Sequence, residues 1–211
     1  SKNIILISEK NDNPLYLLSQ KMKLFFIAHK KYIGGRYSVL SEVGLVPAYL
    51  MGVNILKLRE NLIKHLKKNN KKFLKESSIK LSTLLKKNRF KNIIFFNYVP
   101  KLDKFLYWNQ QLISESLGKN GKGFLPLVST MPKDYHSLLQ LFLDGPRDKF
   151  FYIFSSNIRV KRKINSKILG KKMNFLNNKS LSEIKTAQKN ALVKVLKKNK
   201  IPYREFVIND Y

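Results

Sequence analysis

The stretch Ile33-Gly34-Gly35-Arg36-Tyr37-Ser38 places two adjacent glycines directly before an arginine. Glycine has no Cβ, so its backbone can approach a ligand closely. Arginine carries a permanent charge on a planar fork of donors. An apolar run with a further glycine, Gly44, follows at 39–50. The order predicts a strand at 24–28, a tight turn and a helix start beneath an anion. Most such turns are only turns, so the rest of the chain must decide.

A second candidate is the pair Gln111 and Glu115, four residues apart in a predicted helix at 102–117. This spacing puts both side chains on one helix face. The helix ends at Gly118, and the negative end of a helix disfavours an ionised carboxylate, which makes Glu115 a stronger base. By spacing alone, an ordinary exposed acid explains Glu115 better.

His136 follows a predicted strand at 124–128, near the carboxyl edge of a sheet, where open α/β folds bind ligands. A histidine there can shuttle protons, and a helix-start histidine bonded to its own loop explains it equally well. His29 and His65 are less suggestive. No spacing of histidines and acids is typical of a metal site, and the chain has no cysteine, so we expect no metal and no cofactor.

The order of apolar runs predicts α/β architecture. Residues 3–8 and 24–28 are strand-like and flank a helix at 15–21. An apolar segment at 38–51 predicts a buried helix, and 54–89 predicts two amphipathic helices with a break at 69–72. The remaining chain alternates between predicted strands and helices, at 92–97, 102–117, 124–128, 136–143, 149–155, 182–196 and 204–208.

Composition limits the class of protein. The net charge of +29 points to nucleic acid when taken alone, but 35 of the 42 basic residues are lysines and only seven are arginines. Arginine is the usual reader of bases, so a solvated basic surface explains the charge better. No apolar run is long enough to span a bilayer, and residues 1–4 do not resemble a signal peptide. We therefore expect a cytoplasmic protein without nucleic-acid or membrane partners.

Three segments together resemble glucose-6-phosphate isomerase in its short bacterial form. They are Gly34 to Ser41 with Gly44, the segment Gln111 to Lys119, and Leu125 to Val128 with Asp134 to Pro146. The resemblance covers residues 1–155 well and the tail loosely. Three motifs in the right order are far more specific than any one of them.

The resemblance implies two sugar-isomerase (SIS) domains, each a parallel sheet between helices in a three-layer αβα arrangement. Residues 1–30 would be the end of the first SIS domain, 31–89 the Gly-Gly-Arg turn with a helical connector, and 90–211 the second SIS domain. The chain thus resembles the C-terminal part of a longer enzyme. Neither the family's Ser/Thr-rich phosphate loop nor its last-helix lysine has a match, and Lys185 is not assigned to that role.

The implied activity is an aldose–ketose isomerisation of glycolysis and gluconeogenesis, between glucose 6-phosphate and fructose 6-phosphate, through a cis-enediolate. Glu115 would move the proton, Arg36 would stabilise the developing oxyanion beside Gly34 and Gly35, and Gln111 would position the sugar. His136 would assist ring opening from the other subunit of a homodimer. Two alternatives remain: a non-catalytic SIS module that binds a sugar phosphate and, with less support, a basic nucleic-acid-binding protein.

Overall fold

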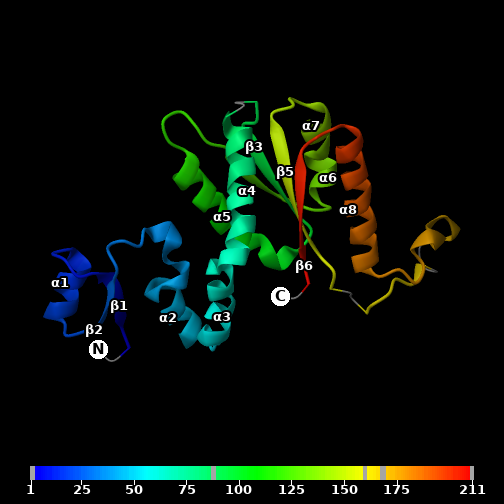
Figure 1. Cartoon of the computed structure of the whole chain (residues 1–211). Coiled ribbons are helices and arrows are strands. Elements are labelled where there is room, and N and C mark those ends of the chain that lie inside the picture. Colours follow the sequence, from blue (N-terminus) through cyan, green and yellow to red (C-terminus); the bar gives the residue numbers. More distant parts are fainter. Residues whose placement is uncertain (1–2, 87–88, 159–160, 167–169, 210–211) are drawn as a thin grey trace. The chain divides into compact units, whose positions relative to one another are not determined.

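The computed structural model describes residues 3–86, 89–158, 161–166 and 170–209 of the 211-residue chain (Figure 1). The chain divides into two compact units, residues 1–80 and 81–211. Helix α4 (Lys68–Lys86) contributes residues to both units.

The first unit opens with two parallel strands, β1 (Ile5–Glu9) and β2 (Phe25–His29), joined by helix α1 (Pro14–Lys21). The side chain of Asn13 accepts a hydrogen bond from the Tyr16 amide, and proline occupies the first turn of the helix. Both features are favoured at a helix start, which is why the sequence predicts this helix well.

The prediction of one buried helix at 38–51 is wrong. The segment forms a 3₁₀ helix, Gly35–Leu40, and then helix α2, Glu42–Leu50, of which no residue is buried. Ser41 has extended backbone angles and therefore separates the two helices. An apolar segment buries itself only where other elements cover it, and Tyr49 and Met51 stay largely exposed in the described structure.

Helices α3 (Ile55–Leu66) and α4 follow, as predicted for 54–89, but the break between them lies at Lys67 rather than at 69–72. Lys67 has an extended ψ of 149°, which ends α3. The local run of lysines and asparagines in the sequence does not distinguish a break at Lys67 from one a few residues later.

The second unit is built on a parallel four-stranded sheet in the order β4-β3-β5-β6. Its strands are β3 (Asn92–Asn97), β4 (Leu125–Thr130), β5 (Lys149–Ser156) and β6 (Tyr203–Ile208). Five of the six residues of β3 are buried. A central parallel strand is covered on both faces, which explains why continuous runs of isoleucine and phenylalanine predict these strands.

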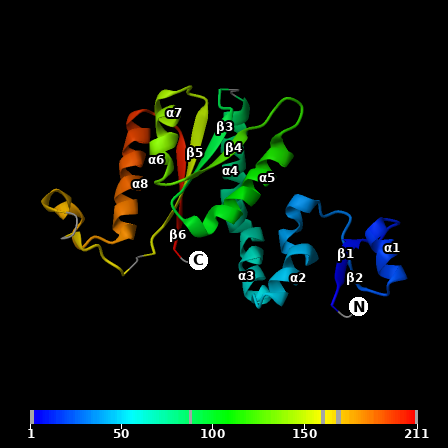
Figure 2. The same ribbon diagram turned by 180° about the vertical axis from the view of Figure 1, so that it is seen from behind.

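Helices cover both faces of this sheet (Figures 1 and 2). Helix α5 (Asp103–Leu117) and the end of α4 pack on one face, over a buried cluster that includes Ile93, Phe95 and Leu106. The opposite face is covered by α6 (Asp134–Ser137), α7 (Leu139–Asp144) and α8 (Leu181–Lys198). The α/β class and the three-layer αβα arrangement are therefore confirmed, while the single helix predicted at 136–143 is in fact two short ones.

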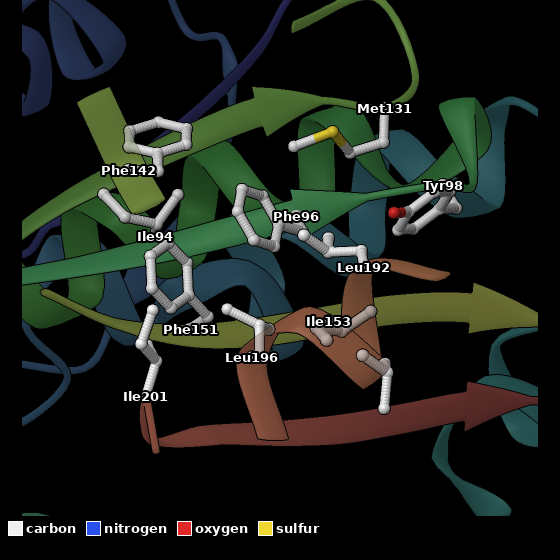
Figure 3. Close-up of a cluster of buried hydrophobic side chains, with 11 residues drawn as sticks. Ile94, Phe96, Tyr98, Met131, Phe142, Phe151, Ile153, Leu192, Leu196 and Ile201 are labelled. Carbon is white, nitrogen blue, oxygen red and sulfur yellow. The ribbon is translucent and has the colours of Figure 1, made fainter. Parts of the chain in front are cut away.

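The larger buried cluster lies between the sheet and α8 (Figure 3). Phe96 of β3 and Phe151 of β5 stack with ring centroids 4.7 Å apart, and Leu192 and Leu196 of α8 pack in the same cluster. Because side chains alternate along a strand, every second residue of β3 and β5 faces α8. This alternation determines which side chains of β3 and β5 lie on the face of the sheet that α8 covers.

The strand order also sets where a crevice can open. The chain leaves β3 through α5 to reach β4 on one side, then returns through α6 and α7 to β5 on the other side of β3. In open parallel sheets, ligands bind beyond the carboxyl ends of the strands at such a reversal. In this unit the reversal lies between β3 and β5. In the part of the chain that the structure describes, no helix is long and apolar enough to cross a membrane.

Candidate functional site

Gln111 and Glu115 lie together on the exposed face of α5. The Gln111 Nε2 donates a hydrogen bond to Glu115 Oε1 over 2.9 Å, as expected for side chains one helical turn apart. The helix ends two residues after Glu115, and its cap Gly118 donates its backbone N–H to the Ser114 carbonyl. The arrangement fixes one carboxylate oxygen of Glu115 and presents the group to solvent, where a substrate can reach it.

Gly34, Gly35 and Arg36 lie in the first unit, in the loop between β2 and α2. Gly34 has φ −65° and ψ 150°, angles open to any residue, so the backbone conformation does not require glycine here. A Cβ added at Gly35 would meet nothing within 4 Å. Nothing in the described chain therefore explains the absence of a side chain at Gly35. The guanidinium of Arg36 lies 4.7 Å from the centre of the Tyr37 ring.

Gly44, by contrast, is required by packing. A Cβ there would lie 2.0 Å from the Val39 carbonyl oxygen, far inside any allowed contact. The side chains of Ser38 and Ser41 close the same turn, with the hydroxyls donating to the carbonyls of Gly35 and Ser38. Glycine is thus present at the two positions for different physical reasons. Gly44 is required for the packing of the turn, whereas the space beside Gly35 is open.

A histidine–glutamate pair closes the loop that carries Arg36. His29 at the end of β2 donates through Nδ1 to Glu42 Oε1 over 2.6 Å and through Nε2 to the Ile33 carbonyl over 2.9 Å. The same carboxylate oxygen accepts the Lys30 amide. An imidazole donates from both nitrogens only when it is protonated. His29 is less suggestive than His136 in the sequence, and only the structure reveals this pair.

The pKa values of the pair shift toward the ionised forms. The hydrogen bond to Glu42 raises the pKa of His29 above its ordinary 6.5, against a smaller opposing effect of burial. Hydrogen bonds from its own backbone N–H, and then from His29 and Lys30, lower the pKa of Glu42 below 4.5. The two groups therefore form an ion pair across a range of pH that includes the interval between these values.

His136 lies exposed on α6, at the carboxyl end of β4. Asp134 holds this turn, because one of its carboxylate oxygens accepts the Ser129 hydroxyl over 2.9 Å and the Thr130 amide over 2.8 Å. The peptide bond between Met131 and Pro132 in the same turn is cis. The hydrogen bonds of Asp134 hold the turn, and the side chain of His136 is exposed.

The sheet separates His136 from Glu115. Helix α5 packs on one face and α6 on the other, so the two side chains belong to opposite faces. They also lie toward opposite ends of the strands. Glu115 lies in the last turn of α5, shortly before β4 begins, and His136 follows the end of β4. A six-residue strand is about 20 Å long at the rise of a parallel strand. Within the second unit the two groups therefore lie on opposite faces of the sheet.

A cavity of about 200 Å³ opens at the reversal between β3 and β5. Residues from the ends of three strands and from the first half of α8 line it; those that bear on the argument are Tyr98, Ser155, Ser182, Lys185, Lys189 and Val207. The Tyr98 hydroxyl is hydrogen-bonded to that of Tyr135. Burial raises the pKa of the Tyr98 phenol far above its ordinary value, so the group stays neutral. Lys185 carries no signal in the sequence, because it is one lysine among many.

Metal-ligating side chains do not gather in the described part of the chain: no group of three histidines, aspartates or glutamates there could hold an ion. The structure thus brings Gln111 and Glu115 together, separates Glu115 from His136, and carries Gly34, Gly35 and Arg36 in the other unit. Together the fold and these residues define an α/β protein with two exposed groups suited to proton transfer.

Comparison with known proteins identifies its relatives. No protein-family model matches the chain. The chain is 39% identical over 138 residues to the glucose-6-phosphate isomerase of Methanocaldococcus jannaschii. The aligned residues make up 63% of this chain and 34% of that protein. It is 30% identical over 199 residues to the glucose-6-phosphate isomerase of Mycoplasmopsis synoviae, 89% of this chain and 45% of that protein. The resemblance inferred from the three motifs is therefore confirmed, and the chain spans less than half the length of these relatives.

A solved structure extends the comparison of the fold. The crystal structure of a hypothetical protein from Thermus thermophilus matches 98% of this chain with a TM-score of 0.80, and the match covers 52% of that protein. Sequence identity in this match is 22%. At this level of identity the likeness concerns the fold alone.

Proposed function

We propose that this chain is part of a glucose-6-phosphate isomerase, which interconverts glucose 6-phosphate and fructose 6-phosphate. The observation that carries the proposal is the sequence similarity to curated glucose-6-phosphate isomerases across up to 89% of the chain in the two relatives compared. The chain contains a carboxylate, an arginine and a histidine in the segments that carry the resemblance. A sensor that only binds a sugar phosphate needs no general base, so the presence of Glu115 favours an enzyme.

In this proposal Glu115 carries the proton between C2 and C1 of the open-chain sugar, through a cis-enediolate. The hydrogen bond from Gln111 orients the carboxylate of Glu115, which takes up the proton as a general base. Arg36 stabilises the negative charge that develops on the substrate oxygen, and the open space beside Gly35 lets the substrate approach the backbone. The proton leaves carbon and returns to the neighbouring carbon, so no cofactor takes part.

His136 assists opening of the sugar ring, and we propose that it does so in the active site of a second copy of the chain. The separation of His136 from Glu115 by the sheet supports a homodimer in which each site draws on both subunits. The exposure of both side chains on their own helices is what a shared site requires.

The domain assignment is part of the same proposal. Residues 1–30 form the end of a first SIS domain, 31–89 the Gly-Gly-Arg turn and the helical connector, and 90–211 the second SIS domain. The parallel β1–α1–β2 unit and the three-layer second unit both support this division. A cytoplasmic location fits this metabolic role.

A coupled assay tests the function directly. Glucose 6-phosphate formation from fructose 6-phosphate is measured with the full product of the gene and with its Glu115→Gln variant. We expect turnover in the parent protein and a loss of about 10²–10⁴-fold in kcat in the variant, the usual contribution of a general base. Glu76→Gln, an equivalent change on the exposed surface of α4, is the control and should keep full activity. Binding of the sugar phosphate without turnover in the parent protein would instead identify a non-catalytic SIS module.

A further inference from the structure

The cavity at the carboxyl ends of β3, β5 and β6 takes no part in the chemistry proposed above. It lies on the face of the sheet that α8 covers, whereas Gln111 and Glu115 belong to α5 on the opposite face. None of the residues to which we assign a role in the isomerisation lines it. A ligand of this cavity must therefore be inferred from the residues that line it.

Ser155 is the most informative of these residues. Its side chain faces α8, because Phe151 and Ile153 of the same strand pack beneath that helix and alternate residues share a face. The residue is only 8% exposed, yet it lines the cavity. Among the residues that the structure describes, its hydroxyl has no hydrogen-bond partner. The hydroxyl opens on the cavity and is therefore placed to donate a hydrogen bond to a ligand there.

The charge around the cavity is positive. Lys185 and Lys189 lie one helical turn apart on α8, and both line the cavity. Lys189 also lies 3.6 Å from a carboxylate oxygen of Glu205, a long ion pair that balances only part of this charge. The N-terminus of α8 is closed by its own capping box, in which the Glu183 carboxylate accepts the Ser180 amide, so the anion-attracting charge comes from the two lysines. Two cations and a hydroxyl donor together select a compact anion.

We propose that this cavity binds a phosphate group, at a site distinct from the isomerase centre. Lys185 and Lys189 neutralise the charge of the phosphate, and Ser155 donates a hydrogen bond to one of its oxygens. The volume of about 200 Å³ is below that of typical metabolite pockets, so it holds the phosphate and little more. Val207 closes the apolar side of the cavity. The phosphate can come from inorganic phosphate or from the end of a phosphorylated metabolite that extends into solvent.

Equilibrium binding tests the proposal with inorganic phosphate and, separately, with glucose 6-phosphate, each added to the 211-residue chain. The ionic strength is held constant with chloride, because a net charge of +29 attracts anions unspecifically. We expect saturable binding at one site, and a loss of affinity on the order of tenfold in each of Lys185→Met and Ser155→Ala. Tighter binding of glucose 6-phosphate that Lys185→Met weakens would identify a phosphorylated metabolite as the occupant of this cavity, and tighter binding of inorganic phosphate would identify the free ion.

Lys194→Met is the matched control. Lys194 is an exposed lysine of the same helix, outside the cavity, so this variant loses the same charge and should change the affinity by about twofold or less. An equal loss in Lys194→Met, unchanged affinity in Lys185→Met, or no saturable binding by the parent chain would overturn the proposal. Lys185 is on the helix surface, so its variant tests the site even if Ser155→Ala fails to fold. The assay needs no turnover, and the comparison with Lys185→Met separates binding in this cavity from binding at the proposed isomerase centre.

Discussion

At the scale of single residues, the two glycines of the Gly-Gly-Arg segment and the glycine that follows them differ in what they do. Gly44 has a backbone carbonyl where a Cβ would lie, and Gly35 has empty space. A sequence pattern records only that all of them are glycine. Stability and activity should therefore respond differently to a methyl group at the two positions.

We predict that Gly44→Ala destabilises the chain by about 1–3 kcal/mol, because the new methyl group collides with the Val39 carbonyl and the turn must shift. Gly35→Ala should change the free energy of unfolding by about 0.5 kcal/mol or less, since the methyl group meets no atom of the chain. Urea unfolding followed by circular dichroism measures both. The substitution at Gly35 should instead lower kcat/KM in the coupled assay, if the space beside it receives substrate. A Gly35→Ala variant with full activity would contradict that role.

The Gln111–Glu115 bond shows how far residue spacing can predict a site. A spacing of four in a helix requires the two side chains to share a face, and the structure joins them over 2.9 Å. The phosphate cavity was not predictable in this way. Ser155 and Lys185 lie on different elements far apart in the sequence, and only the packing of α8 on β5 brings them to one cavity.

At the scale of elements, the central strands β3 and β5 were predictable because a parallel strand covered on both faces is largely apolar. The helix at 38–51 was not, since an apolar segment can be buried, capped or left exposed according to what covers it. The same limit applies to the break at Lys67. The run of lysines and asparagines predicts that the helix breaks in this region, but only the backbone angles of the structure show that the break lies at Lys67.

The His29–Glu42 pair connects two elements, the end of β2 and the start of α2, and makes their connection dependent on pH. A raised pKa at His29 means that the folded chain holds this proton more tightly than the unfolded chain, so its stabilisation is lost as pH rises through the raised value. A lowered pKa at Glu42 means that its stabilisation is lost as pH falls through the lowered value. Both contributions are fully present between 4.5 and 6.5, the ordinary values of the two groups.

We therefore predict that His29→Gln destabilises the first unit by about 1 kcal/mol at a pH between those values, and by less on either side of them. Unfolding of the parent chain and of the variant is compared across a pH series. His65→Gln, on α3, serves as the control and should leave the pH dependence unchanged. A difference between parent and variant that stays constant over the whole pH range would show that the ion pair contributes nothing.

At the scale of the whole molecule, the sheet of the second unit separates the side chains of the helices that cover its two faces. Its two faces carry different candidate groups, Glu115 through α5 on one and His136 through α6 on the other. The sequence identifies both as candidate residues but does not show that they lie on different faces of the sheet. The topology assigns them to different faces of the sheet, which is why we propose that the common site draws on a second chain.

Subunit mixing tests this consequence. In a dimer with shared sites, a Glu115→Gln subunit still supplies His136, and a His136→Ala subunit still supplies Glu115. We predict that unfolding and refolding an equal mixture of the two full-length variants restores about a quarter of the parent activity, because random pairing makes half of the dimers mixed and each mixed dimer holds one intact site. Gln111→Leu mixed with Glu115→Gln is the control: these residues bond within one chain, so no intact site can form. Equal recovery in both mixtures, or in neither, would show that Glu115 and His136 do not meet across an interface.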